Sequence, residues 1–141
     1  MSPAYNSQAT SNSPLQMIAA GDANPALLFN NEIPASGEAS IAVAVQANTA
    51  NADGAAYISI QLECPGGIGA GVFQIQDSDI CDTAGEDFTS INFNGATPGQ
   101  ITSANVNASG TARIELLTKA RFIRVLCVTA PGAAVTVRAS R

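Results

Sequence analysis

Residues 121–138 read RFIRVLCVTAPGAAVTVR, and this stretch decides the predicted fold. Successive side chains of a β-strand point to opposite sides. In residues 121–128 the two faces carry Ile123, Val125 and Cys127 on one side and Phe122, Arg124, Leu126 and Val128 on the other. Because both faces are largely apolar, we expect this strand to be covered on both sides, either centrally in a sheet or by a partner. The turn residues 130–133 (APGA) then predict a hairpin into a strand at 135–138.

Shorter apolar runs that alternate with polar residues occupy most of the remaining chain, and Gly, Pro, Asn and Asp separate them. No long helical pattern lies between these runs, which excludes the crossover helices of a parallel sheet. The sequence therefore predicts an all-β, antiparallel sandwich or jelly-roll-like domain of about eight strands. The expected strands cover residues 27–29, 41–45, 56–62, 72–76, 90–93, 112–117, 121–128 and 135–138, with a weaker run at 101–106.

The N-terminal segment differs from this pattern. Residues 1–13 form a polar segment that we expect to be an extended arm, ordered by a neighbouring subunit, before a sandwich domain at 14–141. Ser13 and Pro14 open either a short helix that ends near Gly21 or an extended segment. Neither a secretory signal nor a run of about 20 apolar residues is present. We therefore expect folding in the cytoplasm and no membrane partner.

The amino-acid composition excludes several classes of catalytic and binding site. Of the 141 residues 46% are hydrophobic, but 26 of these are Ala, so the predicted core is thin. The chain has no His and no Trp, which excludes a His-based catalytic triad and a His-ligated metal. A net charge of −5 argues against a nucleic-acid partner. We therefore expect a protein that is not an enzyme and that uses no cofactor.

Charge is divided along the chain. Residues 1–112 hold ten carboxylates and no Lys or Arg, whereas residues 113–141 hold all six basic residues and one acid, Glu115. Such a division is neutralised either within one chain or between the patches of neighbouring copies. The sequence leaves both alternatives open.

Two loops resemble ligand sites. The Gly-rich residues 66–71 precede a strand and lack the P-loop Lys, so we expect a flexible hairpin loop and not a phosphate site. Residues 77–87 hold five carboxylates, and oxygen ligands of this kind bind Ca²⁺. The weak calcium candidates are Asp77, Asp79, Asp82 and Glu86, and the alternative is a solvated acidic loop.

The chain contains three cysteines, Cys64, Cys81 and Cys127. Cys127 lies in the apolar run 121–128, and we expect it to be a small buried hydrophobe. Cys64 and Cys81 flank a strand and form either a disulfide or, as a reducing compartment favours, two thiols. Without a His to act as a base, none of the three is a candidate nucleophile.

Ala, Gly, Ser, Thr and Asn make up 71 of the 141 residues, and Lys occurs once. Interfaces are depleted in Lys, so such a surface suits contact with other chains. The polar arm, the Ala/Gly/Thr-rich strands and the closing segments 120–125 and 133–137 resemble small virion proteins of tailed bacteriophages. That family includes capsid decoration (cement) proteins and β-sandwich modules of head or tail appendages.

The resemblance implies a non-enzymatic virion protein that binds the major capsid protein or other virion proteins. It also implies self-association, with a trimer favoured, on a capsid surface assembled in the host cytoplasm. The alternative is a receptor- or glycan-binding module of a phage fibre or appendage. The residues that we select as interface candidates are Tyr5, Arg113, Phe122, Arg124 and Leu126.

Overall fold

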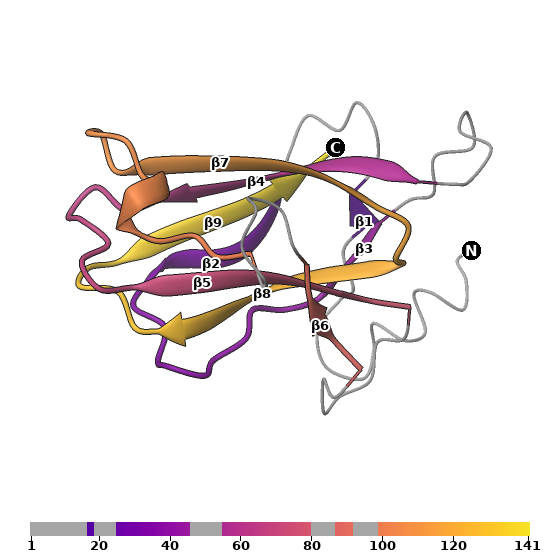
Figure 1. Cartoon of the computed structure of the whole chain (residues 1–141), viewed down its shortest axis with the longest axis horizontal. Coiled ribbons are helices and arrows are strands. Elements are labelled where there is room, and N and C mark those ends of the chain that lie inside the picture. Colours follow the sequence, from indigo (N-terminus) through magenta and orange to yellow (C-terminus); the bar gives the residue numbers. More distant parts are fainter. Residues whose placement is uncertain (1–16, 19–24, 46–54, 80–86, 92–98) are drawn as a thin grey trace.

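The structure is a computed structural model, and it describes residues 17–18, 25–45, 55–79, 87–91 and 99–141. Within these residues two β-sheets pack face to face (Figure 1). The elements are β1 (Met17–Ile18), β2 (Ala26–Glu32), β3 (Val43–Val45), β4 (Ala56–Glu63), β5 (Val72–Ser78), β6 (Thr89–Ser90), the 3₁₀-helix η1 (Ser103–Asn105), β7 (Thr111–Thr118), β8 (Phe122–Thr129) and β9 (Val135–Ser140). None of the helical structure in the described ranges has the length and apolar character needed to cross a membrane.

Strand pairing follows a simple rule. The strands β5 and β6, β4 and β7, β3 and β8, and β2 and β9 pair antiparallel, as in one long ribbon folded back on itself. Rolling this ribbon brings β9 beside β4 and β8 beside β5. The product is the double sheet of a jelly roll, so the predicted β-sandwich is confirmed. The short strand β1 is an addition and pairs parallel with β3.

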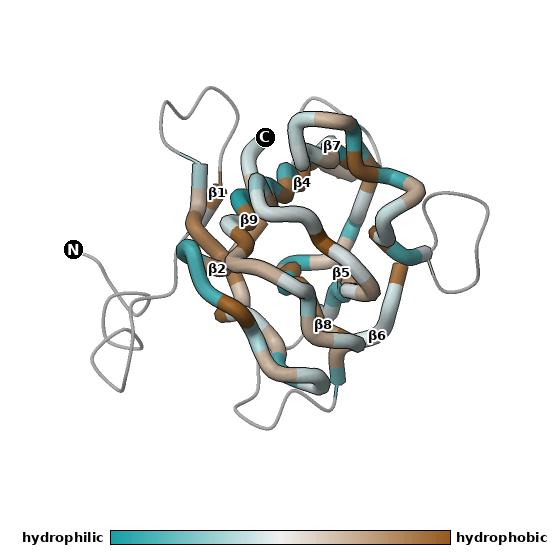
Figure 2. The backbone as a smooth tube through the Cα atoms, turned by 90° about the vertical axis from the view of Figure 1, so that its left-hand side faces the viewer, coloured by the Kyte–Doolittle hydropathy of each residue, from teal (hydrophilic) through white to brown (hydrophobic). Residues whose placement is uncertain are grey.

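The two layers have defined strand orders. Sheet A follows the order β1-β3-β8-β5-β6, and sheet B follows the order β2-β9-β4-β7. Figure 2 looks end-on at these layers. The strand β8 is central in sheet A, which is one of the two alternatives that its apolar faces predict. Of the N-terminal segments, β1 shows that the extended alternative holds at Met17 and Ile18, and residues 1–13, including Tyr5, lie outside the described residues.

The core lies between the sheets, and it is formed by the residues that alternate inward. Phe29 of β2 and Phe73 of β5 meet edge to face, with ring centroids 6.3 Å apart, and so join the two layers. The largest fully buried side chains are Phe73, Ile58, Ile60, Leu62, Ile75, Ile101, Ile123, Val43, Val125, Val135, Val137 and Pro34. Alternation in residues 56–62, 112–117 and 135–138 predicted their inward faces correctly.

Two predicted hairpins are wrong. Residues 130–133 connect β8 of sheet A to β9 of sheet B, and residues 66–71 connect β4 of sheet B to β5 of sheet A. The two crossing loops pack on each other, and the Gly132 N–H donates to the Ile68 carbonyl at 3.1 Å. A Cβ on Gly71 would lie 2.8 Å from the Cα of Pro131, so this close approach requires glycine. The same turn residues occur in hairpins and in loops that connect two sheets. Which strand pairs with which depends on contacts between residues that are far apart in the sequence.

The weak strand predicted at 101–106 is also wrong. Ile101 makes only an isolated bridge to Phe73, and η1 follows it. Thr102 accepts a hydrogen bond from the Ala104 N–H, and the Asn105 side chain accepts one from the Thr102 N–H at 2.9 Å. These local bonds form a capping box, which competes with strand pairing.

Candidate interaction surface

The acidic segment and the start of the basic segment meet at one end of the sandwich. A recess of about 400 Å³ is lined by Asp77, Ser78, Asp79, Asp87, Thr89, Lys119 and Ala120. The pairing of β5 with β8 sets Asp77 opposite Ile123. It thereby brings the acidic segment beside the residues that precede β8. The geometric condition for neutralisation within one chain is therefore met here.

Asp77 is the most constrained carboxyl of this recess. It accepts a hydrogen bond from the Thr118 hydroxyl at 2.9 Å. Burial raises the pKa of Asp77 above its usual 3.8, the Thr118 hydrogen bond opposes the rise, and the nearby Asp79 adds to it. The charged form of Asp77 therefore carries a cost in the folded protein.

The described residues cover only part of the calcium candidate set. Asp82 and Glu86 lie outside the described residues, and Asp77 and Asp79 are the two candidates that the structure describes. Within the described part of the chain, no group of three or more His, Cys, Asp or Glu side chains is placed to hold a metal ion. Lys119 lines the recess and is itself a cation beside these carboxylates. Calcium binding by residues 77–87 stays a prediction.

The outer face of β8 holds three of the interface candidates. Phe122, Arg124 and Leu126 are each half-buried. The Arg124 guanidinium lies 4.3 Å from the centre of the Phe88 ring, and its Nε donates to the Gln76 side chain at 2.8 Å. Part of this face is thus covered by residues of the same chain. Burial of the three residues between copies stays a prediction.

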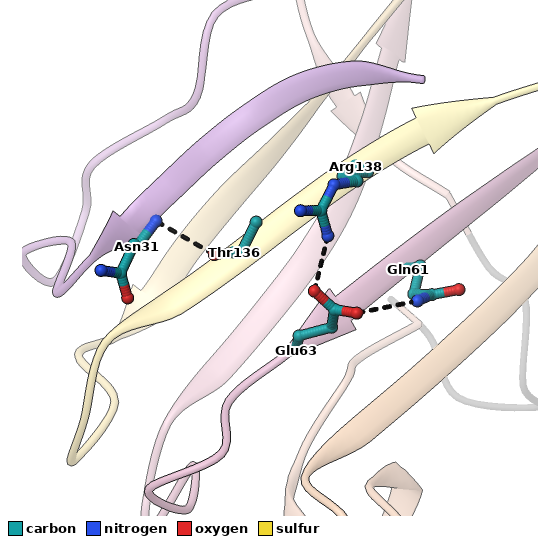
Figure 3. Close-up of polar contacts among 5 residues, drawn as sticks. All are labelled: Asn31, Gln61, Glu63, Thr136 and Arg138. Atoms are coloured by element: carbon teal, nitrogen blue, oxygen red, sulfur yellow. Dashed lines mark hydrogen bonds and ion pairs between the residues drawn. The ribbon is translucent and has the colours of Figure 1, made fainter. Parts of the chain in front are cut away.

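The outer face of sheet B carries an ion pair between distant parts of the chain. Arg138 of β9 and Glu63 of β4 meet with an Nη1–Oε1 distance of 2.5 Å, and Gln61 donates to the other Glu63 oxygen at 3.1 Å (Figure 3). The hydrogen bonds from Arg138 and then from Gln61 lower the pKa of Glu63 below 4.5. This pair joins a carboxylate of the acidic part to a cation of the basic part.

The edge strand β7 of the same face holds Arg113, the fifth interface candidate, which lies across Gln61 from Arg138. On β7 its Nη2 contacts the Glu115 carboxylate at 2.8 Å, and its Nε donates to the Ser59 hydroxyl at 3.1 Å. Both charged side chains are largely exposed. Arg113 therefore stands on an accessible surface, as an interface residue requires.

Two exposed hydrophobic residues lie beside this ion pair, and the sequence analysis did not select them. Tyr57 of β4 is 68% exposed and Leu117 of β7 is 50% exposed, and the strand register sets them directly opposite each other. Alternation places each on the outer face, but their contact depends on the β4–β7 register, which the sequence alone does not show. Tyr57, Leu117, Arg113 and Glu115 are the residues that we call the β7 surface.

The two cysteines in the described residues take no part in these surfaces. Cys64 and Cys127 are buried free thiols, and burial raises the pKa of both. The prediction of Cys127 as a small buried hydrophobe is confirmed. Cys81 lies outside the described residues.

We compared the chain with known protein families, curated proteins and solved structures. The chain matches no protein-family model, no curated protein and no solved structure.

Proposed function

We propose that this chain is a non-enzymatic structural protein of a tailed-phage virion, which associates with itself and decorates the capsid by binding the major capsid protein. Its binding surfaces are the outer faces and edges of the sandwich. No chemical step is assigned to any residue in this proposal.

The observation that carries the proposal is the β7 surface. An exposed aromatic and an exposed aliphatic side chain lie side by side on the strands β4 and β7, next to one Arg–Glu pair. Tyr and Arg are enriched in protein interfaces, and neighbouring exposed apolar side chains that are rimmed by polar residues are typical of interaction sites. The single Lys in 141 residues agrees with a surface that other chains cover.

Fold and resemblance add weight to this reading. Eight-stranded jelly rolls serve in viral capsid domains and also in lectins and cupins, so the fold is compatible with a virion role. The sequence resemblance to small virion proteins of tailed phages favours the role in a virion over the other two.

Co-sedimentation with phage heads tests the proposal. Purified chain is mixed with tailed-phage heads from its own source culture and pelleted through a sucrose cushion. We expect saturable binding, and we expect Tyr57→Ser with Leu117→Ser to weaken it. Ile33→Ser is the matched control, because Ile33 is an equally exposed hydrophobic residue, 58% exposed, in the loop after β2. A chain that stays in the supernatant at every concentration contradicts the proposal.

A second function has one observation in its favour. A recess of about 240 Å³ on sheet B is lined by Pro25, Ser59, Gln61, Arg113, Arg138 and Ser140, which offer the hydrogen-bonding groups that a sugar needs. The chain would then be a glycan-binding module of a fibre or appendage. A glycan array probed with the purified chain and with Gln61→Ala separates the two functions, because only a glycan module gives a signal that Gln61→Ala removes.

A further inference from the structure

We propose that the outer edge of β7 is a self-association surface, on which a second copy of the chain adds its own β7 in antiparallel orientation. The two four-stranded B sheets then form one continuous sheet across a two-fold axis. This inference deepens the proposed function, on which it rests, by naming the partner and the edge used for self-association. A two-fold pair also replaces the trimer that the resemblance implies.

The backbone of β7 shows which groups are available. The register of β4 and β7 is continuous from Ala56 opposite Thr118 to Glu63 opposite Thr111. Just beyond it the Cys64 N–H donates to the Gly110 carbonyl at 2.7 Å, which makes these two residues a hydrogen-bonded pair. Hydrogen-bonded and non-bonded pairs alternate along an antiparallel ladder. Even-numbered residues of β7 therefore bond to β4, and odd-numbered residues face away from it.

Three residues consequently point their backbone groups outward. The N–H and C=O groups of Arg113, Glu115 and Leu117 face the open edge, and no hydrogen bond from another described residue reaches them. Thr111 agrees with this assignment, because its carbonyl accepts the Asn107 N–H at 2.9 Å instead of facing β4. An edge of this kind is a template for another strand.

The charges on β7 select the partner and the register. A second β7 has to set odd residues against odd residues, because only these have outward backbone groups. Of the central registers, one sets Arg113 against the partner's Arg113 and one sets Glu115 against the partner's Glu115. The register between them sets Arg113 against the partner's Glu115, and Glu115 against the partner's Arg113. Opposite charges directly across a sheet stabilise it and like charges destabilise it, so β7 is complementary to itself in this register.

The inward side of β7 supports the same register. Ile114 is only partly buried, although it packs against the core, since no strand lies beyond it among the described residues. In the selected register the two-fold axis passes beside Ile114, which then faces the partner's Ile114. The second copy thus covers an apolar side chain that one copy leaves partly exposed.

Charge reversal in two separate chains provides the test. We expect the wild-type chain to have twice its 14.3-kDa mass by light scattering at high concentration. Arg113→Glu and Glu115→Arg should each weaken this dimer by about tenfold or more, since each sets like charges across the axis. An equal mixture of the two variants should dimerise again, because a strand with two carboxylates then faces a strand with two guanidinium groups. The mixture restores no ion pair within a chain, so recovery reports contact between chains alone.

Cysteine cross-linking is an independent measurement that does not depend on high affinity. Under mild oxidation Ile114→Cys should give a covalent dimer above the background of the parent chain, since residue 114 faces itself across the axis. Ala112→Cys is the control, because residue 112 faces residue 116 in this register. Equal cross-linking of both variants, dimers unaffected by charge reversal, or a monomeric wild type each overturns the inference.

The dimer assay contains no phage heads, so the two proposals fail separately. A dimer that does not bind heads refutes the proposed function and leaves the β7 pairing in place. A monomer that binds heads does the reverse.

Discussion

The two edges of sheet B are built differently. At one edge, β2 pairs with β9 through two register shifts, and Asn31 adopts a left-handed conformation with φ of 50°. There the Asn31 N–H donates to the Thr136 hydroxyl at 3.1 Å, so a side chain takes the place of a backbone partner (Figure 3). At the other edge, β7 pairs with β4 through eight consecutive residues without any shift.

This difference indicates where the molecule is prepared for a partner strand. Proteins protect edges with bulges and short strands. In the described residues β2 is irregular, and the edge strands β1 and β6 of sheet A each contain two residues. The strand β7 is the long and regular edge in that part of the chain. Four sets of substitutions are ordered from the largest expected effect to the smallest, and the first three test the contrast between β2 and β7.

Proline distinguishes the inward from the outward backbone groups of β7. Ala112→Pro removes an N–H that bonds to β4 and forces a ring into the core, and we expect it to lower the free energy of unfolding by about 3 kcal/mol. Arg113→Pro removes an outward N–H and should cost below about 1 kcal/mol. Urea denaturation measures both at a concentration where the chain is monomeric. Equal losses would show that the assigned alternation is wrong.

Gly110 anchors the start of the regular edge. Its φ is 82°, and an added Cβ would lie within 3 Å of the Cys64 carbonyl. We expect Gly110→Ala to lower the free energy of unfolding by about 2–3 kcal/mol. Gly37→Ala is the matched control, because Gly37 has φ of 90° and nothing within 4 Å of a Cβ. It should cost only about 1 kcal/mol of backbone strain, as thermal denaturation will show.

Asn31 tests the irregular edge in the same way. Asn tolerates the left-handed conformation better than residues without a short polar side chain. We expect Asn31→Ala to lower the free energy of unfolding by about 1 kcal/mol and Asn31→Gly to leave it unchanged or slightly raised. The contrast is measured by chemical denaturation. A stabilising Asn31→Ala would mean that this bulge is not strained.

The smallest effect concerns the carboxyl groups and pH. The folded pKa of Glu63 is lowered, so Glu63 adds stability above pH 4.5, and this stability is lost as pH falls through the folded pKa. Asp77 acts in the opposite direction, because its raised folded pKa penalises the charged form, and the penalty disappears as pH falls toward 3.8. We expect Arg138→Gln to raise the Glu63 pKa and to cost below about 1 kcal/mol. A carboxyl NMR titration measures the change, with Arg113→Gln as the control.

Local patterns accounted for much of the fold. Alternation in residues 56–62, 112–117 and 121–128 placed strands and inward faces correctly, because a two-residue period is a property of each strand alone. The same alternation places Arg113 on the outer face of its strand, and the structure shows it exposed there. The hairpins at 66–71 and 130–133 failed, because the turn residues do not carry information about which sheet the next strand joins.

The two-faced apolar pattern of residues 121–128 limited this strand by itself to two alternatives, a central position in a sheet or an outer face covered by a partner. The tertiary structure places β8 at the centre of sheet A, with its outer face only half-buried. Composition by itself excluded chemistry that depends on His. Only the tertiary structure decided that Tyr57 faces Leu117 and that β7 is a regular edge while β2 is not. The physical reason is that register and edge position depend on contacts between residues far apart in the chain, and a local pattern contains neither.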